Sequence, residues 1–327
     1  MKHIEKNLIS TIDRIESMFS EKFYQVDFDH LAIDKAVAKT IHNDNGFYFE
    51  IVKMVMTSQK DSQELLDKDD EIITLLNLKH KIKFKIRESE KVKSSVSVNG
   101  FTKISGIIRD FKTSHYENFE KDSFYRAVIL TEKEFSVSRY FKIEHLLKVD
   151  EITYGSGVLE ILVNGINLHL YLYKDRVSSK NYFIIETVEQ CNYESFENLI
   201  DEIILSVTYL TGIFLGDSVY FLASKSSNFQ RDELVSLKSF FDELKSSYAV
   251  IPDLNLHREL VGNLNDFMTP QVLSKFIETL YNDLIYKRTV LQICQGCDEP
   301  YYVAATLYSV ALETITTLIS PLMGIPV

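Results

Sequence analysis

The chain has 327 residues, which exceeds the usual size of a single hydrophobic core, so two domains or three are expected. Its 45% hydrophobic and 25% charged residues are typical of a globular protein and exclude disorder over most of the length. The formal net charge of −11 excludes a protein that coats nucleic acid through its overall field, and leaves only a local basic patch for that role.

The N-terminal segment predicts helix. Residues 3–20 place apolar side chains at helical spacing, which indicates an amphipathic opening helix, and a second helix is predicted at 29–42. The first six residues carry charges where a secretory signal needs an apolar core. We therefore expect a cytoplasmic protein.

The middle of the chain predicts strands joined by tight turns. Asn-Gly pairs tolerate the positive φ angles that a two-residue hairpin turn needs, and they occur at 45–46, 99–100 and 164–165. The third joins two runs rich in strand-forming residues, 158–163 and 166–173. Further strands are predicted at 47–56, 81–87, 96–108, 123–130 and 182–188. This pattern favours a mostly antiparallel sheet.

After Cys191 the apolar period changes to that of a helix over residues 196–210, followed by a short strand at 219–222. From Phe229 onward only helices are predicted, among them a stripe of Leu234, Leu237, Phe240, Phe241 and Leu244. Thr269-Pro270 is a helix cap with a first-turn proline, and it opens a long predicted helix at 271–292.

The predicted fold class is therefore α+β, with a mostly antiparallel sheet domain and flanking helices followed by an all-helical C-terminal domain. The short polar stretch 224–228 marks the boundary before the helices. The predicted division has a helical and strand region at 1–92, a β-rich domain with a helix at 93–226, and a helical domain at 227–327.

The last predicted helix begins near Pro300 and is apolar on both faces, so partners must cover both. Glu313, several hydroxyl residues and two prolines argue against a membrane span, and we expect no membrane partner. The remaining coverings are earlier helices, a second copy of the chain, or sequence beyond residue 327. A homo-oligomer is the expected assembly, and Leu312 is expected in the core.

One basic segment is a candidate binding site. In a strand, Lys79, Lys81, Lys83, Lys85 and Arg87 share one side. Such a row can follow a phosphate backbone or another acidic partner. The alternative is a solvent-facing edge strand whose lysines prevent aggregation, and the lack of interleaved aromatic residues favours it.

No convincing catalytic constellation is present. Cys294-Gln-Gly-Cys297 has the spacing of zinc and thiol redox sites, but no further ligands lie nearby, so a connecting turn is favoured. Arg109 and His115 have a spacing that suits some metal-independent ribonucleases on a helix, yet they follow a predicted strand. No metal, no cofactor and no catalytic residue is predicted.

The C-terminal pattern from Pro300 to Ile315, with Ala311-Leu312-Glu313 and the preceding long helix, resembles the entry into a HEPN helical domain. It is most similar to the ApeA-like bacterial antiphage defence proteins. The resemblance covers under about a tenth of the chain and its signature is of low specificity. It implies a dimeric, metal-independent ribonuclease whose catalytic arginine and histidine lie on a later helix, so no residue of this chain inherits those roles.

Two functions remain open. On the resemblance, the chain is the sensing or regulatory region of an abortive-infection protein that controls a HEPN-type ribonuclease, with RNA or a phage-derived molecule as trigger. The alternative is a non-enzymatic binding or assembly protein that dimerises through its apolar C-terminal helices. In that case a sheet edge near Asn164 would suit the addition of a peptide strand.

Overall fold

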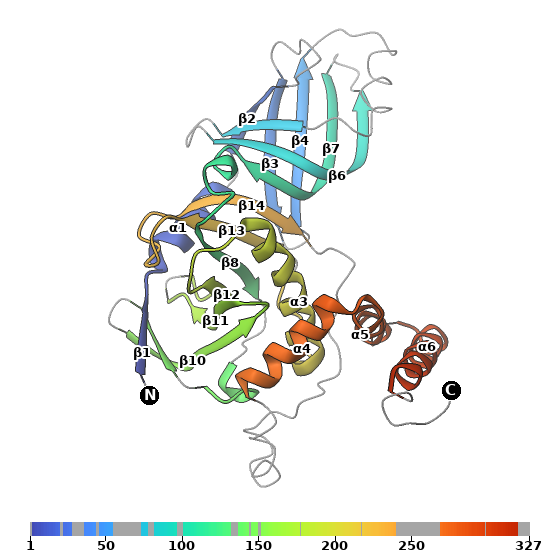
Figure 1. The fold of residues 1–327 in the computed structure, drawn as a ribbon. Coiled ribbons are helices and arrows are strands. Elements are labelled where there is room, and N and C mark those ends of the chain that lie inside the picture. The colour runs from blue at the N-terminus through green and yellow to red at the C-terminus, as the bar shows by residue number, and fades with distance from the viewer. Residues whose placement is uncertain are drawn as a thin grey trace.

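The computed structural model describes the chain in fourteen stretches, within some of which the backbone alone is placed. They are residues 2–19, 22–27, 36–43, 46–54, 73–77, 82–96, 101–131, 137–143, 145–149, 152–176, 178–216, 218–239, 269–297 and 299–319. The fold is α+β: a mostly antiparallel sheet carries helices, and the last three helices form an all-helical C-terminal region (Figure 1). The predicted fold class is confirmed.

The strands form one continuous hydrogen-bonded ladder. Its order is β1 (Lys2–Lys6), β9 (His145–Val149), β10 (Ile152–Val163), β11 (Ile166–Lys174), β12 (Asn181–Thr187), β8 (Phe124–Thr131), β13 (Ser218–Ser224), β14 (Glu233–Ser239), β7 (Phe101–Thr113), β4 (Gly46–Met54), β3 (Ala36–Asn43), β2 (Lys22–Asp27), β5 (Ile73–Asn77) and β6 (Ile82–Val96). All these neighbours are antiparallel except β1 and β9, which are parallel.

The end of the ladder closes on itself. β6 pairs with β7 as well as with β5, so β7, β4, β3, β2, β5 and β6 form a barrel (Figure 1, top). β7 belongs to both parts, because it pairs with β4 over Phe101–Ile107 and with β14 over Asp110–Lys112. We call the first eight strands of the ladder the body sheet. They are β1, β9, β10, β11, β12, β8, β13 and β14.

Two helices cover one face of the body sheet. The Asn192 side chain accepts hydrogen bonds from the N–H groups of Glu194 and Ser195 and starts α3 (Tyr193–Thr211), and Gly212 at φ 70° ends it. This helix is the one predicted after Cys191. It packs with α4 (Pro270–Asn282) onto alternate side chains of β8, β10, β11, β12 and β13, which form the larger core.

A shorter helix covers the opposite face. α1 (Ile9–Phe19) buries Leu8, Ile12 and Ile15 against the other set of alternate side chains, including Tyr171 and Ile184. The opening helix is thus confirmed only from Ile9, because Lys2–Lys6 forms the edge strand β1 beside β9. Two single 3₁₀ turns complete the described elements, η1 (Tyr116–Asn118) and η2 (Val137–Arg139).

Two predicted helices are wrong. Ala36–Asn43, part of the helix expected at 29–42, forms β3, and residues 28–35 lie outside the described stretches. Glu233–Ser239, which carries the first half of the predicted leucine stripe, forms β14 between β13 and β7. A short apolar run fits both periods, and here pairing on two sides satisfies its backbone.

The other local predictions agree with the structure. Asn164 at φ 48° and Gly165 at φ 79° make the two-residue turn between β10 and β11, where Val163 pairs with Ile166. At the first Asn-Gly pair a hairpin is present, but Gly46 belongs to β4 and pairs with Asn43, so the turn residues are 44–45, which lie outside the described residues, as does the pair at 99–100. The six strands predicted from 47 to 222 outside this hairpin correspond to β4, β6, β7, β8, β12 and β13.

The predicted three-part division stays a prediction, but the described strands run across both of its limits. β6 contains residues 92 and 93, and the turn near residue 226 joins the paired strands β13 and β14. The boundary at 226 therefore does not separate sheet from helices.

The C-terminal helices are α4, α5 (Leu284–Gly296) and α6 (Tyr301–Ile319). Thr269 caps α4 as predicted, accepting from the N–H of Val272. The long helix expected at 271–292 is two helices, because Asp283 is extended at φ −119° and its carboxylate caps α5 through the N–H groups of Ile285 and Tyr286.

Two glycines with positive φ differ in how closely neighbouring atoms approach them. At Gly216 (φ 152°) an added Cβ would clash with the backbone oxygen of Leu130, whereas at Gly165 it would meet nothing within 4 Å. Gly216→Ala should therefore lower the free energy of unfolding by about 2–4 kcal/mol, and Gly165→Ala by about 1 kcal/mol. Urea unfolding measures both, and an equal loss in the two variants would contradict this account.

Candidate functional site

Four polar side chains cross the α1 face of the body sheet. Glu160 is paired with His169, His169 with Glu186, and Glu186 with Arg126, on the adjacent strands β10, β11, β12 and β8. Directly opposite residues point to the same side of a sheet, so these four side chains form a line, which we call the charge row. Arg126 and Glu186 have no exposed surface.

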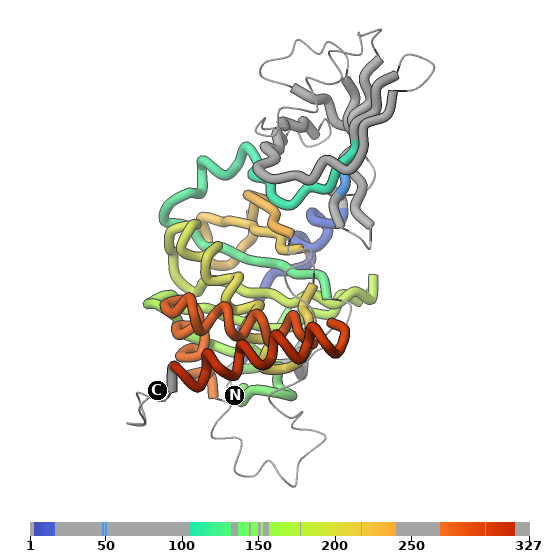
Figure 2. Tube along the Cα trace, turned by 90° about the vertical axis from the view of Figure 1, so that its right-hand side faces the viewer, coloured from blue at the N-terminus to red at the C-terminus, as the bar shows by residue number. Residues whose placement is uncertain are grey.

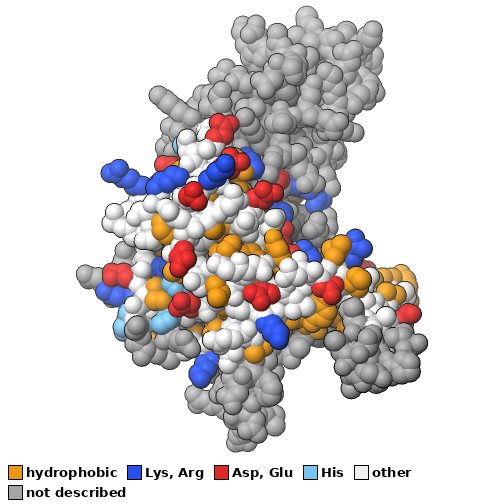
Figure 3. Space-filling view, viewed as in Figure 1, with side chains coloured by type: hydrophobic (Ala, Val, Ile, Leu, Met, Phe, Trp, Pro, Cys, Tyr) orange, Lys and Arg blue, Asp and Glu red, His pale blue; other side chains and the backbone are white. Residues whose placement is uncertain are grey.

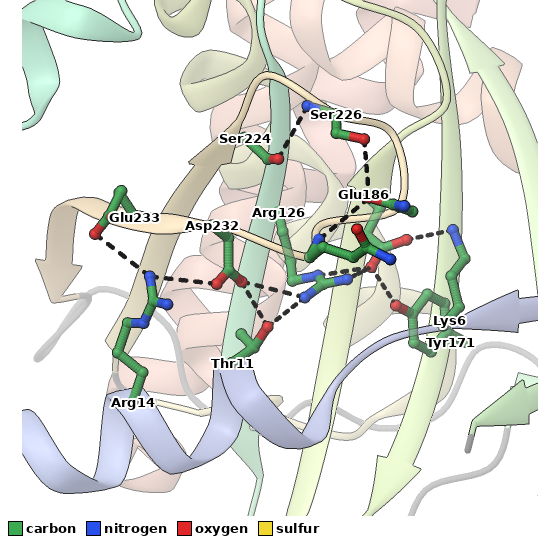
Figure 4. Close-up of polar contacts among 12 residues, drawn as sticks. Lys6, Thr11, Arg14, Arg126, Tyr171, Glu186, Ser224, Ser226, Asp232 and Glu233 are labelled. Atoms are coloured by element: carbon green, nitrogen blue, oxygen red, sulfur yellow. Dashed lines mark hydrogen bonds and ion pairs between the residues drawn. The ribbon is translucent and has the colours of Figure 1, made fainter.

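Glu186 is the centre of the charge row. Arg126 donates from Nε to Glu186 Oε1 at 2.6 Å, Tyr171 donates its hydroxyl to the same oxygen at 2.5 Å, and Lys6 pairs with Oε2 (Figure 4). Burial by itself would raise the pKa of Glu186, but the charges of Arg126 and Lys6 outweigh it and hold the pKa at about 2. The carboxylate is therefore ionised at neutral pH beneath α1.

The far side of Arg126 binds α1. Its Nη1 donates to Thr11 Oγ1 at 2.5 Å and lies 3.3 Å from Asp232 Oδ2, while Thr11 donates to the same Asp232 oxygen at 2.5 Å. Arg14, one turn along α1, reaches Asp232 Oδ1 at 3.5 Å and Glu233 Oε2 at 3.3 Å (Figure 4). Together with Lys6, these contacts fix the N-terminal segment to the sheet.

The ring of Phe229 packs against the guanidinium group of Arg126. Its ring centroid lies 4.2 Å from Arg126 Cζ, and the side chain is 1% exposed. The residue has φ 51°, a left-handed conformation that is unfavourable for a bulky side chain. Hydrogen bonds in the β13–β14 turn hold it there, including Ser226 N to Ser224 Oγ and Gln230 N to Asn228 Oδ1.

The row reaches solvent at its other end. His169 contacts the Lys6 ammonium through Nδ1 at 3.1 Å, and His145 Nε2 lies 3.2 Å from Glu160 Oε2. Glu160 is the exposed member, with 44% of its side chain accessible. Burial, reinforced by the charge of Lys6, lowers the pKa of His169 to about 4, so this imidazole is neutral at pH 7.

These contacts are suited to holding structure, because the charges of Arg126, Glu186 and Asp232 are paired with one another. Among the described residues, no group of three or more His, Cys, Asp or Glu is arranged to hold a metal ion. Sequence reasoning missed the charge row, although single charges inside the apolar strands FYRAVILT and NYFIIET are a signal for buried ion pairs.

The predicted lysine row is only partly described. Lys79 and Lys81 lie outside the described residues, and Lys83, Lys85 and Arg87 lie on β6. Here β6 is paired on both sides, Lys85 with Thr74 and with Lys112, so the alternative of a protective edge strand is wrong. A bulge falls between Ile86 and Glu88, which interrupts the strict alternation at Arg87. Binding by this row stays a prediction.

The sheet edge near Asn164 is occupied. The Leu162 N–H donates to Ser274 Oγ at 3.2 Å and the Asn164 N–H to Glu278 Oε1 at 3.1 Å, both on α4. These donors are not free for an added peptide strand. Arg109 lies in β7 and His115 in the turn after it, so they do not share a helix face.

The helical region forms a second feature, exposed rather than buried. α6 contacts α5 extensively, and the two run side by side on the outside of the molecule (Figure 2). Tyr301, Tyr302 and Leu312 are 89%, 73% and 67% exposed, and only Ala311 is fully buried among the described α6 side chains. The expectation that Leu312 lies in a core is wrong, because no described element covers that side of α6.

Exposed hydrophobic side chains concentrate in this region, over α4 and along the α5–α6 pair (Figure 3). They are Val272, Tyr281, Leu284, Ile285, Tyr301, Tyr302, Val310 and Leu312. We call these eight residues the helical surface. Exposed apolar side chains gathered in one region of a protein are typical of interaction sites.

Comparison of the chain with family models, with curated proteins and with solved structures gives no match. Within the described stretches, no helix is both long and apolar enough to cross a membrane. The charge row and the helical surface are therefore the two features of the molecule that bear on its function.

Removing one partner of the buried ion pair should strongly destabilise the protein. Arg126→Met leaves the Glu186 carboxylate buried with fewer partners and should lower the free energy of unfolding by about 3–5 kcal/mol. Lys180→Met, which breaks the exposed Lys180–Glu16 pair at 2.9 Å, is the control and should cost about 0–1 kcal/mol. Similar urea midpoints for the two variants would argue against a central role for Glu186.

Acid should destabilise the fold in two steps. The pKa of His169 is lower in the folded than in the unfolded chain, so stability falls as the pH drops from about 6.5 to about 4. The pKa of Glu186 is also lowered, so its contribution is lost from about pH 4.5 to about pH 2. His169→Gln should flatten the first step, measured as unfolding free energy against pH, whereas His3→Gln on exposed β1 should leave it unchanged.

Proposed function

We propose that the chain is the regulatory region of a bacterial defence protein, and that its helical surface packs against the helices of a HEPN-type ribonuclease domain. The observation that carries the proposal is the exposure of α6, whose main described neighbour is α5 and whose large side chains Tyr301, Tyr302 and Leu312 are exposed. Large apolar side chains exposed on a helix can be buried by packing against a second helix.

The shape of the helical surface supports a helical partner. α6 has 19 residues and is about 28 Å long. Of its described exposed positions, only Glu313 is charged. A partner helix that lies along α6 would therefore meet Tyr302, Val310 and Leu312 without burying unpaired charges.

The resemblance to the ApeA-like proteins supports the choice of a HEPN domain as the partner. It implies that the catalytic arginine and histidine lie on a later helix, so the present residues would regulate and not cleave. The barrel is the candidate sensor for RNA or a phage-derived trigger, since β6 carries Lys83, Lys85 and Arg87.

A second candidate is a non-enzymatic assembly protein that forms homodimers through the same surface. Its support is electrostatic: two copies of a chain with net charge −11 repel one another, and the nearly uncharged outer side of α6 is where they can approach at least cost. The two candidates share the surface and differ in what covers it.

Leu312→Asp tests the helical surface. Because Leu312 is 67% exposed, the substitution should change the unfolding free energy of the isolated chain by no more than about 0.5 kcal/mol, yet it should abolish association. Ile9→Asp, at a 48% exposed position on α1, is the matched control and should leave association intact. Light scattering gives the mass of the isolated chain, and self-association that survives Leu312→Asp would refute the assembly candidate.

The intact mass of the protein purified from its native host separates the two. A mass well above 37.9 kDa, together with metal-independent RNA cleavage by that product, would support the ribonuclease proposal. A native polypeptide of 37.9 kDa that dimerises without cleaving RNA would overturn it and leave the assembly candidate.

A further inference from the structure

We propose that Cys294 and Cys297 form a reversible disulfide at the end of α5, and that this modification loosens the packing of α6 on α5. The inference does not depend on which partner covers the helical surface. It rests on the geometry of the last turn of α5 and on one contact that this turn makes with α6.

The last turn of α5 places Cys294 and Cys297 three residues apart within one helical turn. The Cys297 N–H donates to the Cys294 carbonyl at 3.3 Å, an i to i+3 bond that closes a 3₁₀ turn. Side chains three residues apart eclipse in such a turn, and a rise of about 2 Å per residue separates the Cα atoms by about 6 Å. That spacing lies within the range of about 4.4–6.8 Å found in disulfides.

The two cysteines differ in exposure, which assigns their roles. Cys297 is partly exposed and Cys294 is fully buried, so an oxidant from solvent meets Cys297 first and Cys294 is the resolving thiol.

The oxidant that we assign is a hydroperoxide, with hydrogen peroxide as the simplest case. The Cys297 thiolate attacks one peroxide oxygen, the O–O bond breaks, and the departing hydroxide takes a proton and leaves as water. The Cys294 thiolate then attacks the sulfenic sulfur, forming the S–S bond, and the S–O bond breaks with loss of a second water. Two thiols are oxidised and one peroxide is reduced to two waters.

The modified turn is linked to α6 by Tyr308. Its hydroxyl donates to Cys297 Sγ at 3.3 Å. A Cβ added to Gly296 would lie 3.0 Å from Tyr308 Cε1, so the two helices approach closely at this point. Bonding of Cys297 Sγ to Cys294 draws the sulfur out of the hydrogen bond with Tyr308. Since α5 is the principal neighbour of α6 in the described structure, the change loosens α6.

The test uses the full 327-residue chain treated with hydrogen peroxide at mildly alkaline pH and then with dithiothreitol. Mass spectrometry should show the loss of two hydrogen atoms, a disulfide within the peptide that contains both cysteines, and recovery on reduction. Cys191→Ser should behave as the parent does, because burial raises the pKa of Cys191 to about 12 and makes this thiol unreactive. Cys294→Ser should instead accumulate oxygen on Cys297.

Hydrogen exchange reads out the consequence. Amides of α6 should exchange about fivefold faster after oxidation, as expected for loss of one hydrogen bond, while those of α3 should not change. Tyr308→Phe should exchange faster even when reduced and should respond little to peroxide. Absence of the intrahelical disulfide in the parent would overturn the modification site. Its presence with unchanged α6 exchange would overturn the link to α6.

Discussion

The buried carboxylate of Glu186 is the constraint on which the arrangement of the body depends. An anion with no exposed surface must be matched by donors, and here these come from β8, β11 and the segment before α1. The same match orients Arg126 toward Thr11 and Asp232, so the N-terminal helix and the β13–β14 turn are set by one charge. Apolar packing alone would allow α1 to slide along the sheet. The ionic contacts define a single position.

The α1 face of the body sheet and the helical surface differ in whether their side chains are enclosed by other parts of the structure. Polar groups beneath α1 are enclosed and paired, and the strained turn at Phe229 is tolerated because it completes that enclosure. The helical surface lacks such closure in the described structure, since its tyrosines and leucines face outward. A rigid, self-satisfied body that presents an open apolar helix pair has the organisation expected of a binding module.

Local chemistry made part of this structure predictable. The Asn164-Gly165 turn and the Thr269-Pro270 cap depend on a few neighbouring residues, and both were read correctly from the sequence. Strand β14 was not, because its short apolar run fits both periods and one of its two pairing partners, β7, lies far away in the chain. The charge row was missed for the same reason: Arg126 and Glu186 are 60 residues apart, and Lys6 and Glu186 are 180 apart. The apolar pattern of α6 fits a buried helix and an exposed interaction helix equally well. The sequence therefore predicted a core position for Leu312, whereas the structure exposes it.

The sharing of β7 between the barrel and the body sheet has a mechanical consequence. A strand that is hydrogen-bonded along its length resists bending and stretching, so its two halves cannot twist independently. If a ligand tightened the barrel around Phe101–Ile107, the torsion would pass through the strand to Asp110–Lys112 and from there to β14. β14 begins at Glu233, whose carboxylate pairs with Arg14 of α1, so strain in the barrel and the position of the N-terminal helix are coupled through the paired strands β7 and β14.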